Sequence, residues 1–477
     1  MFKRQTLCQE QPKIIFNVGA LKAFWFGCPA NLRSTAYNLS AQITFMSIFD
    51  QLPRLSAYDP GATGEGGLDP LGLSAIADRI ADVLAPGVRA RMSQPRFVTV
   101  SAVGAIAYQT LLDVTADLGK TTVDIAFEWL VVEAMVRHPN EGRTEGLPGN
   151  QKAARALATG QRLSRGTYLN GPRVFGFTGV YRPFSRDVGV LTTDDRPGLN
   201  SPKLVSAWER DLKLEGYLDG DLGKPGGQLR KEIADACLRS LEQGSCAAKE
   251  NGKLLRTLSD CLAPREAKAT ERRMLRELIR TGDHEIRNEI TAMLVASPPV
   301  GGVTQRDLAM HLLKGANPST GRALQAAIDY EDAATALDYA FRRFLAYAVQ
   351  HSGSVVNKSQ AQQTPGLEEL APRIGDLVER AKTSVDELGD GDLSNATERA
   401  FRLFSGRFSR GEFLDLLLER HEEVQANKKK LSWVDQIEGD WTVRVPYRNQ
   451  TGDLDVANWT HPMRLLTLAN FLTETNS

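Results

Sequence analysis

The sequence predicts a mainly α protein, multi-helical, with a winged-helix/helix-turn-helix-like element and a small C-terminal β-hairpin. Apolar residues recur at helical spacing along most of the 477 residues. Residues that start and stop helices punctuate many of these segments. Strict alternation of apolar and polar residues, which is typical of a strand, is clear near residues 441–447. These three observations together favour helical layers over a sheet-based fold.

The overall charge excludes a protein with a global basic field. Lys plus Arg and Asp plus Glu both number 58, so the net charge is zero and nucleic-acid binding requires a local patch. The five cysteines are scattered and form no CxxC pair, which favours a reducing compartment and argues against a zinc site. No apolar run approaches the ~20 residues of a membrane span. We therefore expect a cytoplasmic protein without cofactor, metal or membrane contact.

Changes in composition predict the domain organisation. The first 45 residues have no clear period, and we expect an extension or arm there, with the natural start at Met46. The segment SGSVVNKSQAQQTPG has the composition of a linker. The predicted parts are an N-terminal arm (1–45), a helical N-terminal domain with the winged-helix-like element (46–200), a helical middle domain (201–351), a linker (352–366) and an acidic helical C-terminal domain that ends in a β-hairpin and a helix (367–477).

The best-punctuated helix begins near Asp69. Asp69 is placed to cap it, and Pro70 suits the first helical position, where its missing N–H costs nothing. Pro86-Gly87 ends the helix, and a segment with three arginines and no acid follows. One face of the helix is apolar and is expected to be buried: Leu73, Ile76, Ala77, Ile80 and Leu84.

Three further helices are expected to form the cores. Residues 97–117 predict a buried helix that is rich in small residues. Residues 121–124 offer a capping box for a helix that ends near Arg137 and is apolar nearly all round, as expected for a central core helix. Asn317-Pro318 starts the longest helix, which runs to about Gln350 and spans roughly 50 Å. We expect this long helix to be a scaffold spine.

Residues 151–190 carry a local basic excess. Seven basic residues face a single acid, Asp187, which gives a local charge of +6 in a chain of net zero. A short helix, a turn, a second short helix and an aromatic–glycine segment follow the outline of a winged-helix unit. The interleaved aromatics are predicted to form its core, or alternatively a stacking surface: Tyr168, Phe175, Phe177 and Tyr181. Arginine-rich surface also pairs with acids of the same chain, and the acidic C-terminal region is the expected partner in that case.

Other motifs in the chain are weak. YDPGATGEGG and Gly119-Lys120-Thr121 each lack part of a phosphate-binding loop, and we interpret the first as a flexible loop and the second as a turn between two helices. His284 fails the HExxH pattern, and His461 before proline is interpreted as a turn residue. The acids from Asp386 to Asp392 lack the lysine and the strands of a nuclease. In the tail, a strand from Trp441 is expected to turn at residues 450–453 and to pair with residues 454–459.

Two blocks of the sequence resemble a known family. LDPLGLSAIADRIADVLAPGVRARMSQPRF is similar to the N-terminal signature of an uncharacterised family of bacterial proteins encoded in anti-phage defence islands. GLPGNQKAARALATGQRLSRGTYLNGPRVFGF is similar to the second block of that family. The two blocks cover roughly residues 68–182 and consist of helix punctuation and arginines. The resemblance implies an accessory protein that works beside helicases, ATPases or nucleases, and it implies no catalytic residues.

The expected function is a non-catalytic DNA-binding or recognition subunit of a multi-protein anti-phage defence complex. Its arginines and lysine would meet the phosphates of double-stranded DNA, which position a protein without reading sequence. The expected nucleic-acid-binding residues are Arg89, Arg91, Arg96, Lys152, Arg155, Arg162, Arg165, Arg173 and Arg182. The alternatives are a protein–protein scaffold without nucleic-acid contact and, third, a metal-dependent nuclease that uses the acids from Asp386 to Asp392.

Overall fold

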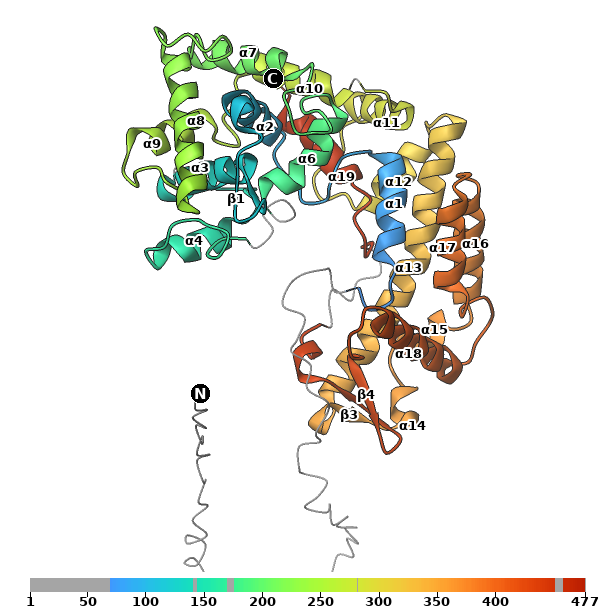
Figure 1. Cartoon of the computed structure of the whole chain (residues 1–477). Coiled ribbons are helices and arrows are strands. Elements are labelled where there is room, and N and C mark those ends of the chain that lie inside the picture. Colours follow the sequence, from blue (N-terminus) through green and yellow to red (C-terminus); the bar gives the residue numbers. More distant parts are fainter. Residues whose placement is uncertain (1–68, 140–143, 170–175, 281, 451–457, 477) are drawn as a thin grey trace, which may run out of the picture. The chain divides into compact units, whose positions relative to one another are not determined.

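Helices make up most of the protein, as the sequence predicts. The computed structural model describes residues 69–139, 144–169, 176–280, 282–450 and 458–476 (Figure 1). The predicted arm at 1–45, the start at Met46, the loop before Asp69, and the residues Arg173 and Phe175 lie outside the described residues. The described residues all belong to one compact unit, Ser56–Ser477.

In the first part of the chain, two buried helices lie at the centre. Every residue of α2 is buried, and α2 packs on α6, α7 and α8, while α3 packs on α4, α8 and α9 (Figure 1). The elements of this part are α1 (Ser74–Leu84), α2 (Arg96–Ala107), η2 (Gln109–Leu111), β1 (Thr115–Ala116), β2 (Thr121–Thr122), α3 (Val123–Arg137), α4 (Asn150–Ala158), α6 (Phe177–Asp187), α7 (Ser201–Leu212), α8 (Pro225–Gln243), α9 (Lys253–Cys261) and α10 (Ala269–Arg280).

In the second part, the long helix α13 is the common packing surface. It contacts α1, α12, α16 and α18, and Figure 1 shows α16 and α17 beside it. The elements are α11 (Glu285–Ala296), α12 (Gln305–Leu313), α13 (Pro318–Gln350), η3 (Ser352–Ser354), β3 (Val355–Val356), α14 (Lys358–Ala361), α15 (Leu367–Leu370), α16 (Ile374–Asp386), α17 (Gly391–Phe401), α18 (Arg410–Asn427), β4 (Val434–Ile437), β5 (Asp440–Val443), η4 (Val445–Tyr447) and α19 (Leu465–Glu474).

The long helix has the predicted bounds. Asn317 is the N-cap, and its side chain accepts a hydrogen bond of 2.8 Å from the backbone N–H of Thr320. Pro318 occupies the first helical position, where no N–H is needed. The helix continues for 33 residues to Gln350. Local capping chemistry was therefore enough to define the start of this element.

The opening helix starts later than predicted. Asp69 accepts hydrogen bonds from the backbone N–H groups of Leu73, at 2.9 Å, and Ser74, at 3.1 Å. It thus caps the helix from several residues upstream, and α1 begins at Ser74 rather than at Pro70. The predicted apolar face is buried, since none of its residues is more than 5% exposed.

The stretch before α1 is bound by α18 and the segment after it. The backbone carbonyl of Leu71 accepts a hydrogen bond of 3.1 Å from Arg420 Nε. His421 lies between the carbonyl of Pro70, 2.9 Å from Nδ1, and the N–H of Trp433, which donates to Nε2 at 2.9 Å. Burial lowers the pKa of His421 to about 4, so the ring is neutral and matches this donor–acceptor pattern.

The helix predicted at 97–117 is shorter than expected. It ends at Ala107, and a 3-10 turn and a two-residue antiparallel pair, β1 with β2, follow. Asp117 and Leu118 have positive φ values of 52° and 57°, which is the left-handed conformation of a tight turn rather than of a helix. Gly119-Lys120-Thr121 therefore lies in a hairpin turn and at the start of β2.

The C-terminal β structure differs from the predicted hairpin. β5 pairs antiparallel with β4, which precedes it, and the turn between them is Glu438-Gly439. β3 pairs with the other edge of β5 and completes a three-stranded sheet. The expected pairing with residues 454–459 was wrong about the partner, because the alternating pattern does not say which neighbouring segment supplies it. Residues 451–457 lie outside the described part.

Packing does not follow the predicted domain boundaries. One cluster of buried hydrophobic residues extends from Leu71 to Leu472, and α2 packs on α7 and α8 across the boundary at residue 200. The segment 352–366, predicted as a linker, holds η3, β3 and α14, and Val356 is fully buried in it. Its polar composition misled because a few apolar residues are enough to fix a short segment against a core.

Candidate functional site

The predicted basic segment and the buried helix α3 form one polar cluster. Helix α3 was expected to be apolar nearly all round, yet Asp124 is 6% exposed and Glu128 and Glu133 are fully buried. A buried carboxylate is costly unless a cation or hydrogen-bond donors face it. The partners of these three acids come mainly from residues 162–182, which is where the sequence predicted nucleic-acid contacts.

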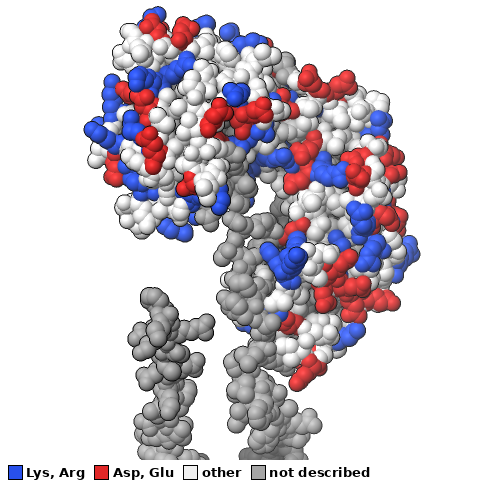
Figure 2. Space-filling view, in the orientation of Figure 1, with Lys and Arg blue, Asp and Glu red and all other residues white. Residues whose placement is uncertain are grey.

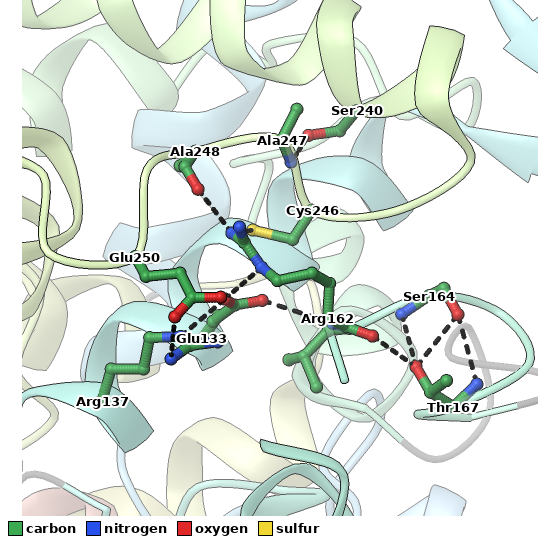
Figure 3. A network of polar contacts seen from close by, with 11 residues as sticks. Glu133, Arg137, Arg162, Ser164, Thr167, Ser240, Cys246, Ala247, Ala248 and Glu250 are labelled. Atoms are coloured by element: carbon green, nitrogen blue, oxygen red, sulfur yellow. Dashed lines mark hydrogen bonds and ion pairs between the residues drawn. The ribbon is translucent and has the colours of Figure 1, made fainter. Parts of the chain in front are cut away.

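Glu133 is the centre of the network shown in Figure 3. Its Oε1 lies 2.7 Å from Nε of Arg137, one turn along α3, and 2.7 Å from Nε of Arg162. Its Oε2 accepts the backbone N–H of Leu163 at 3.3 Å. Arg137 also reaches Glu250 at 3.1 Å. Glu133 therefore ties α3 to the segment that follows α4.

Arg162 joins this network to the segment after α8. Its Nη2 donates to the backbone carbonyl of Ala248 and lies 3.4 Å from Sγ of Cys246. The N–H of Cys246 donates in turn to the carbonyl of Leu163 at 2.8 Å. The Arg162 side chain is 25% exposed. It is held by the fold, so its predicted role as a phosphate contact conflicts with its position.

Asp124 pairs with a second arginine of the basic segment. Arg182, on α6, forms an ion pair with Asp124 and lies 3.4 Å from Asp195. Arg186, one turn further, lies 2.8 Å from the same Asp195. The Arg182 side chain is 13% exposed. Its expected role in DNA binding was predicted from charge alone, and its charge is instead neutralised by two acids of the same chain.

Glu128 has no cation as its main partner. Its Oε2 accepts the backbone N–H of Thr178 at 2.8 Å, in the first turn of α6, where the helix dipole favours a negative charge. Gly176 approaches so closely that a Cβ there would overlap the carboxylate. Burial raises the pKa of Glu128 to about 7, against the lowering effect of the Thr178 hydrogen bonds. This acid therefore titrates near neutral pH.

Arg96 is the clearest correction to the predicted site. Its side chain is 1% exposed and forms a bidentate pair with Glu271, with distances of 3.0 and 3.1 Å. It also donates to the backbone carbonyls of Ala263 and, at 3.0 Å, Cys261. An arginine enclosed in this way fastens α2 to α10 and is not accessible to a phosphate. The sequence of the basic segment that contains Arg96 does not show that this side chain points inward.

The other two arginines of that run lie nearer the surface. Arg89 is 39% exposed and lies 3.2 Å from Asp82, an acid that also pairs with Arg464. Arg91 is exposed. The segment that carries them does meet the later block, because Ser93 donates to the carbonyl of Gly146 at 3.1 Å and the N–H of Gln94 donates to the hydroxyl of Tyr181 at 2.9 Å.

Three predicted contacts lie at the surface. Lys152 and Arg155 are exposed on one side of α4, and Arg165 is half-buried in the loop that follows. None of the three forms an ion pair with another described residue. Residues 150–169 contain no acid. This leaves a small basic surface, defined by Lys152, Arg155 and Arg165, which we call the α4 surface.

The described aromatics of the basic segment form core rather than a stacking surface. Tyr168, Phe177 and Tyr181 are no more than 1% exposed. The Phe97 ring lies 5.4 Å from that of Phe177 and 5.0 Å from that of Tyr181. Helix α4 packs on α3, and α6 packs on α2 and α3. The core interpretation is thus confirmed for these three residues, while the winged-helix-like element stays a prediction.

The acids proposed for a nuclease serve other purposes. Asp390 caps α17 through the N–H groups of Asp392 and Leu393, both at 3.1 Å, and pairs with Arg79 at 2.7 Å. Asp386 accepts a hydrogen bond of 2.7 Å from Ser394. Over the described ranges, His, Cys, Asp and Glu form no group of three that would hold a metal ion.

The acidic C-terminal region was the alternative partner expected for the basic segment, but Arg162, Arg182 and Arg186 pair with acids from elsewhere.

The remaining sequence motifs are also structural where they are described. His284 and the buried Arg287 both pair with Asp187, and His461 pairs with the buried Glu331 at 2.7 Å. Cys237, Cys246 and Cys261 are buried free thiols, and burial raises the pKa of Cys246 and Cys261 to about 12. These thiols are protonated at neutral pH, so they are poor nucleophiles.

The distribution of charge gives no continuous basic surface on the visible face. Figure 2 shows lysines and arginines interspersed with acids.

In the part of the chain that the structure describes, no helix combines the length and apolar character needed to cross a membrane. The comparisons with known proteins add no further evidence, since no family model, curated protein or solved structure matches this chain.

Proposed function

We propose that this chain is a non-catalytic scaffold subunit of a multi-protein assembly. The observation that carries the proposal is the internal use of the arginines: Arg96, Arg162 and Arg182 each pair with a buried acid of the same chain. A surface in which both signs alternate suits protein partners better than a polyanion. The resemblance to defence-island proteins suggests partners of the helicase, ATPase or nuclease type.

Co-purification tests the scaffold role. The chain is co-expressed with the products of the neighbouring genes, and the mixture is separated by size-exclusion chromatography with light scattering. We expect a stable complex with at least one of those products. If each neighbour elutes separately from the chain at micromolar concentration, the scaffold proposal fails.

The second proposal is a DNA contact through the α4 surface, within the same defence complex. It rests on the exposure of Lys152 and Arg155 and on the lack of any acid in residues 150–169. In this proposal α4 belongs to a winged-helix-like element that sits on the phosphate backbone. Arg91 would extend the contact. Arg162 and Arg182, which pair with acids of α3, would then hold the segments around α4 in place from within.

A salt titration separates the two proposals. Binding of a short double-stranded DNA is measured by fluorescence anisotropy for the wild type and for Lys152→Glu, Arg155→Glu and Arg165→Glu combined. Removing one phosphate contact should reduce the slope of log K against log salt by about 1. Arg273→Glu, at an exposed arginine of α10, is the matched control. An unchanged slope in the triple variant rejects the DNA contact.

A further inference from the structure

Helix α10 presents a row of arginines on one face. We call it the α10 arginine row, and its members are Arg272, Arg273, Arg276 and Arg280. At ~100° and ~1.5 Å per residue, the row covers an arc of about 100° and extends about 12 Å along the helix. Arg273 and Arg280 are exposed, and Arg272 and Arg276 are half-buried. Because the buried side chains of α10 include Leu275 and Leu278, the row lies on the solvent side of the helix.

The charges of the row are not neutralised within the described protein. Helix α10 contains two acids, and one of them, Glu271, is buried and pairs with Arg96. In the part of the chain that the structure describes, none of the four arginines forms an ion pair. Arg276 does donate from Nη1 to Oδ1 of Asn476, a neutral amide that orients the guanidinium and leaves its charge in place. The row differs in this respect from Arg96, Arg162 and Arg182, which all pair with buried acids.

The spacing of the row opposes the stability of α10 itself. Arg276 lies four residues from both Arg272 and Arg280, and like charges at this spacing are neighbours on the surface and destabilise a helix. Arg272 and Arg273 also lie near the N-terminal end of the helix, where the helix dipole disfavours cations. An exposed face that served only solubility would avoid both costs by alternating the two signs of charge. The arrangement therefore indicates an anionic partner that offsets these costs.

The row is carried by a well-anchored helix. Helix α10 packs on α7, α11 and α19, and Figure 1 shows it between α7 and α11. The bidentate pair of Arg96 with Glu271 fastens it to α2 from the buried side. A surface that is fixed before binding loses less conformational entropy when a partner docks. The four guanidinium groups are thus presented from a preformed platform.

We propose that the α10 arginine row docks an acidic face of a helix in a partner protein. This inference rests on the scaffold proposal and specifies the chemistry of the partner. Arg272, Arg276 and Arg280 follow one another at about 6 Å along the axis, which is also the spacing of carboxylates at every fourth position of a second helix. Each guanidinium is able to pair with a carboxylate through two parallel hydrogen bonds. Duplex DNA suits the row less well, because proteins that bind it make as many as ~6–10 phosphate contacts.

Two synthetic peptides test the docking on the full chain. Both have about 20 residues, which is long enough for a helix in water, and both have the same composition of alanine, glutamine and glutamate. The first has glutamate at every fourth position, and the second has its glutamates spread around the helix. By fluorescence anisotropy at low salt, we expect the first to bind with a Kd of about a millimolar or lower, and about threefold or more tightly than the second. Equal affinities, or no binding of the first peptide at millimolar protein, overturn the proposal.

Charge reversal locates the binding on α10. Arg273→Glu with Arg280→Glu should weaken binding of the first peptide about tenfold or more, because two attractive contacts become repulsive. Arg256→Glu with Arg322→Glu reverses two exposed arginines on α9 and α13 and is the matched control, which should bind as the wild type does. Circular dichroism checks that both double variants are folded. Equal affinities of the two double variants for the peptide overturn the assignment to α10. A larger loss of duplex DNA binding in the α10 double variant than in the control also overturns it, in favour of a nucleic acid.

Co-expression with the neighbouring gene products separates this inference from the scaffold proposal. We expect the complex that the wild type forms to be lost in the α10 double variant and kept in the control. A complex that survives in the α10 double variant overturns the role of the row and leaves the scaffold proposal standing. If the wild type forms no complex, the scaffold proposal itself fails.

Discussion

Helices α3 and α13 each bury three acids and satisfy them in different ways. On α3, Asp124 and Glu133 pair with arginines from another segment. On α13, Asp329 accepts from Ser384 at 2.5 Å, Glu331 faces His461, and Asp338 pairs with Arg342 one turn away. Arginine stays charged at all accessible pH values, whereas histidine does not. The arginine pairs of both helices therefore stay charged across the pH range, whereas the pair of Glu331 with His461 on α13 depends on pH.

The largest expected effect is at Glu133. Glu133→Gln leaves Arg162 and Arg137, whose side chains are 25% and 17% exposed, without their shared carboxylate. Breaking a buried ion pair in this way costs about 3–5 kcal/mol, which urea unfolding measures. Glu250→Gln removes an acid that is 49% exposed from the same Arg137 and should cost less than about 1 kcal/mol. An equal loss of unfolding free energy in both variants would show that burial of the acid does not strengthen its pairing with arginine.

Glu128 is the one buried acid of α3 whose main partner is not an arginine, and its protonation gives a second test. Its pKa is raised from 4.5 to about 7, so the folded state binds a proton that the unfolded state releases between these values. Wild-type stability should therefore fall by roughly 2–4 kcal/mol as the pH rises from 4.5 to 7. Glu128→Gln keeps an acceptor for Thr178 and should remove this part of the pH dependence. Identical profiles of stability against pH in both proteins would contradict the assignment.

His461 gives the corresponding test on α13. Burial lowers the pKa of His461, but the charge and hydrogen bond of Glu331, with smaller contributions from other acids, outweigh it and raise the pKa above 6.5. Because the folded pKa is raised, the stabilisation is fully present below pH 6.5 and is lost as the pH rises through the folded value. His461→Asn should therefore cost about 1–2 kcal/mol at pH 6 and much less near pH 9, by chemical denaturation. A cost that is the same at both pH values would show that the His461–Glu331 pair behaves like the pH-independent arginine pairs of α3.

The smallest effect is expected at the α4 surface. Lys152→Ala with Arg155→Ala should change the unfolding free energy by about 0.5 kcal/mol or less, because exposed positions without partners contribute little. Arg162→Ala, ten residues further, should cost several-fold more because it removes a contact to Glu133. Thermal unfolding distinguishes the two variants. A similar decrease in the unfolding free energy of both would show that the exposed and the paired basic residues contribute equally to stability.

Local rules predicted much of the fold. The cap at Asn317, the apolar face of α1 and the end of α3 at Arg137 follow from neighbouring residues, and each is found in the structure. The start of α1 was misplaced because Asp69 reaches forward over four residues to cap it. The partner of β5 was wrong because strand pairing is decided by tertiary packing.

The site was harder to predict, because the sequence does not show whether a charged side chain points outward to solvent or inward to a buried partner. Arg96, Arg162 and Arg182 were chosen as cations, and their partners Glu271, Glu133 and Asp124 lie 175, 29 and 58 residues away. One signal was present in the residues. A helix as apolar as 123–137 that contains three acids requires donors, and the neighbouring segment with its excess of arginines contains them.

The binding of residues 69–73 by α18 has a consequence for synthesis of the chain. The carbonyls of Pro70 and Leu71 meet residues that lie 351 and 349 positions later. At ~5–20 residues per second, a ribosome needs roughly 20–70 s to reach those partners after the stretch is made. Helix α13, which packs on α1, begins 234 residues after α1 ends, so the apolar face of α1 lacks this partner for most of that time. The nascent chain therefore carries an exposed hydrophobic helix for most of its elongation, which makes it a substrate for chaperones until its last third emerges.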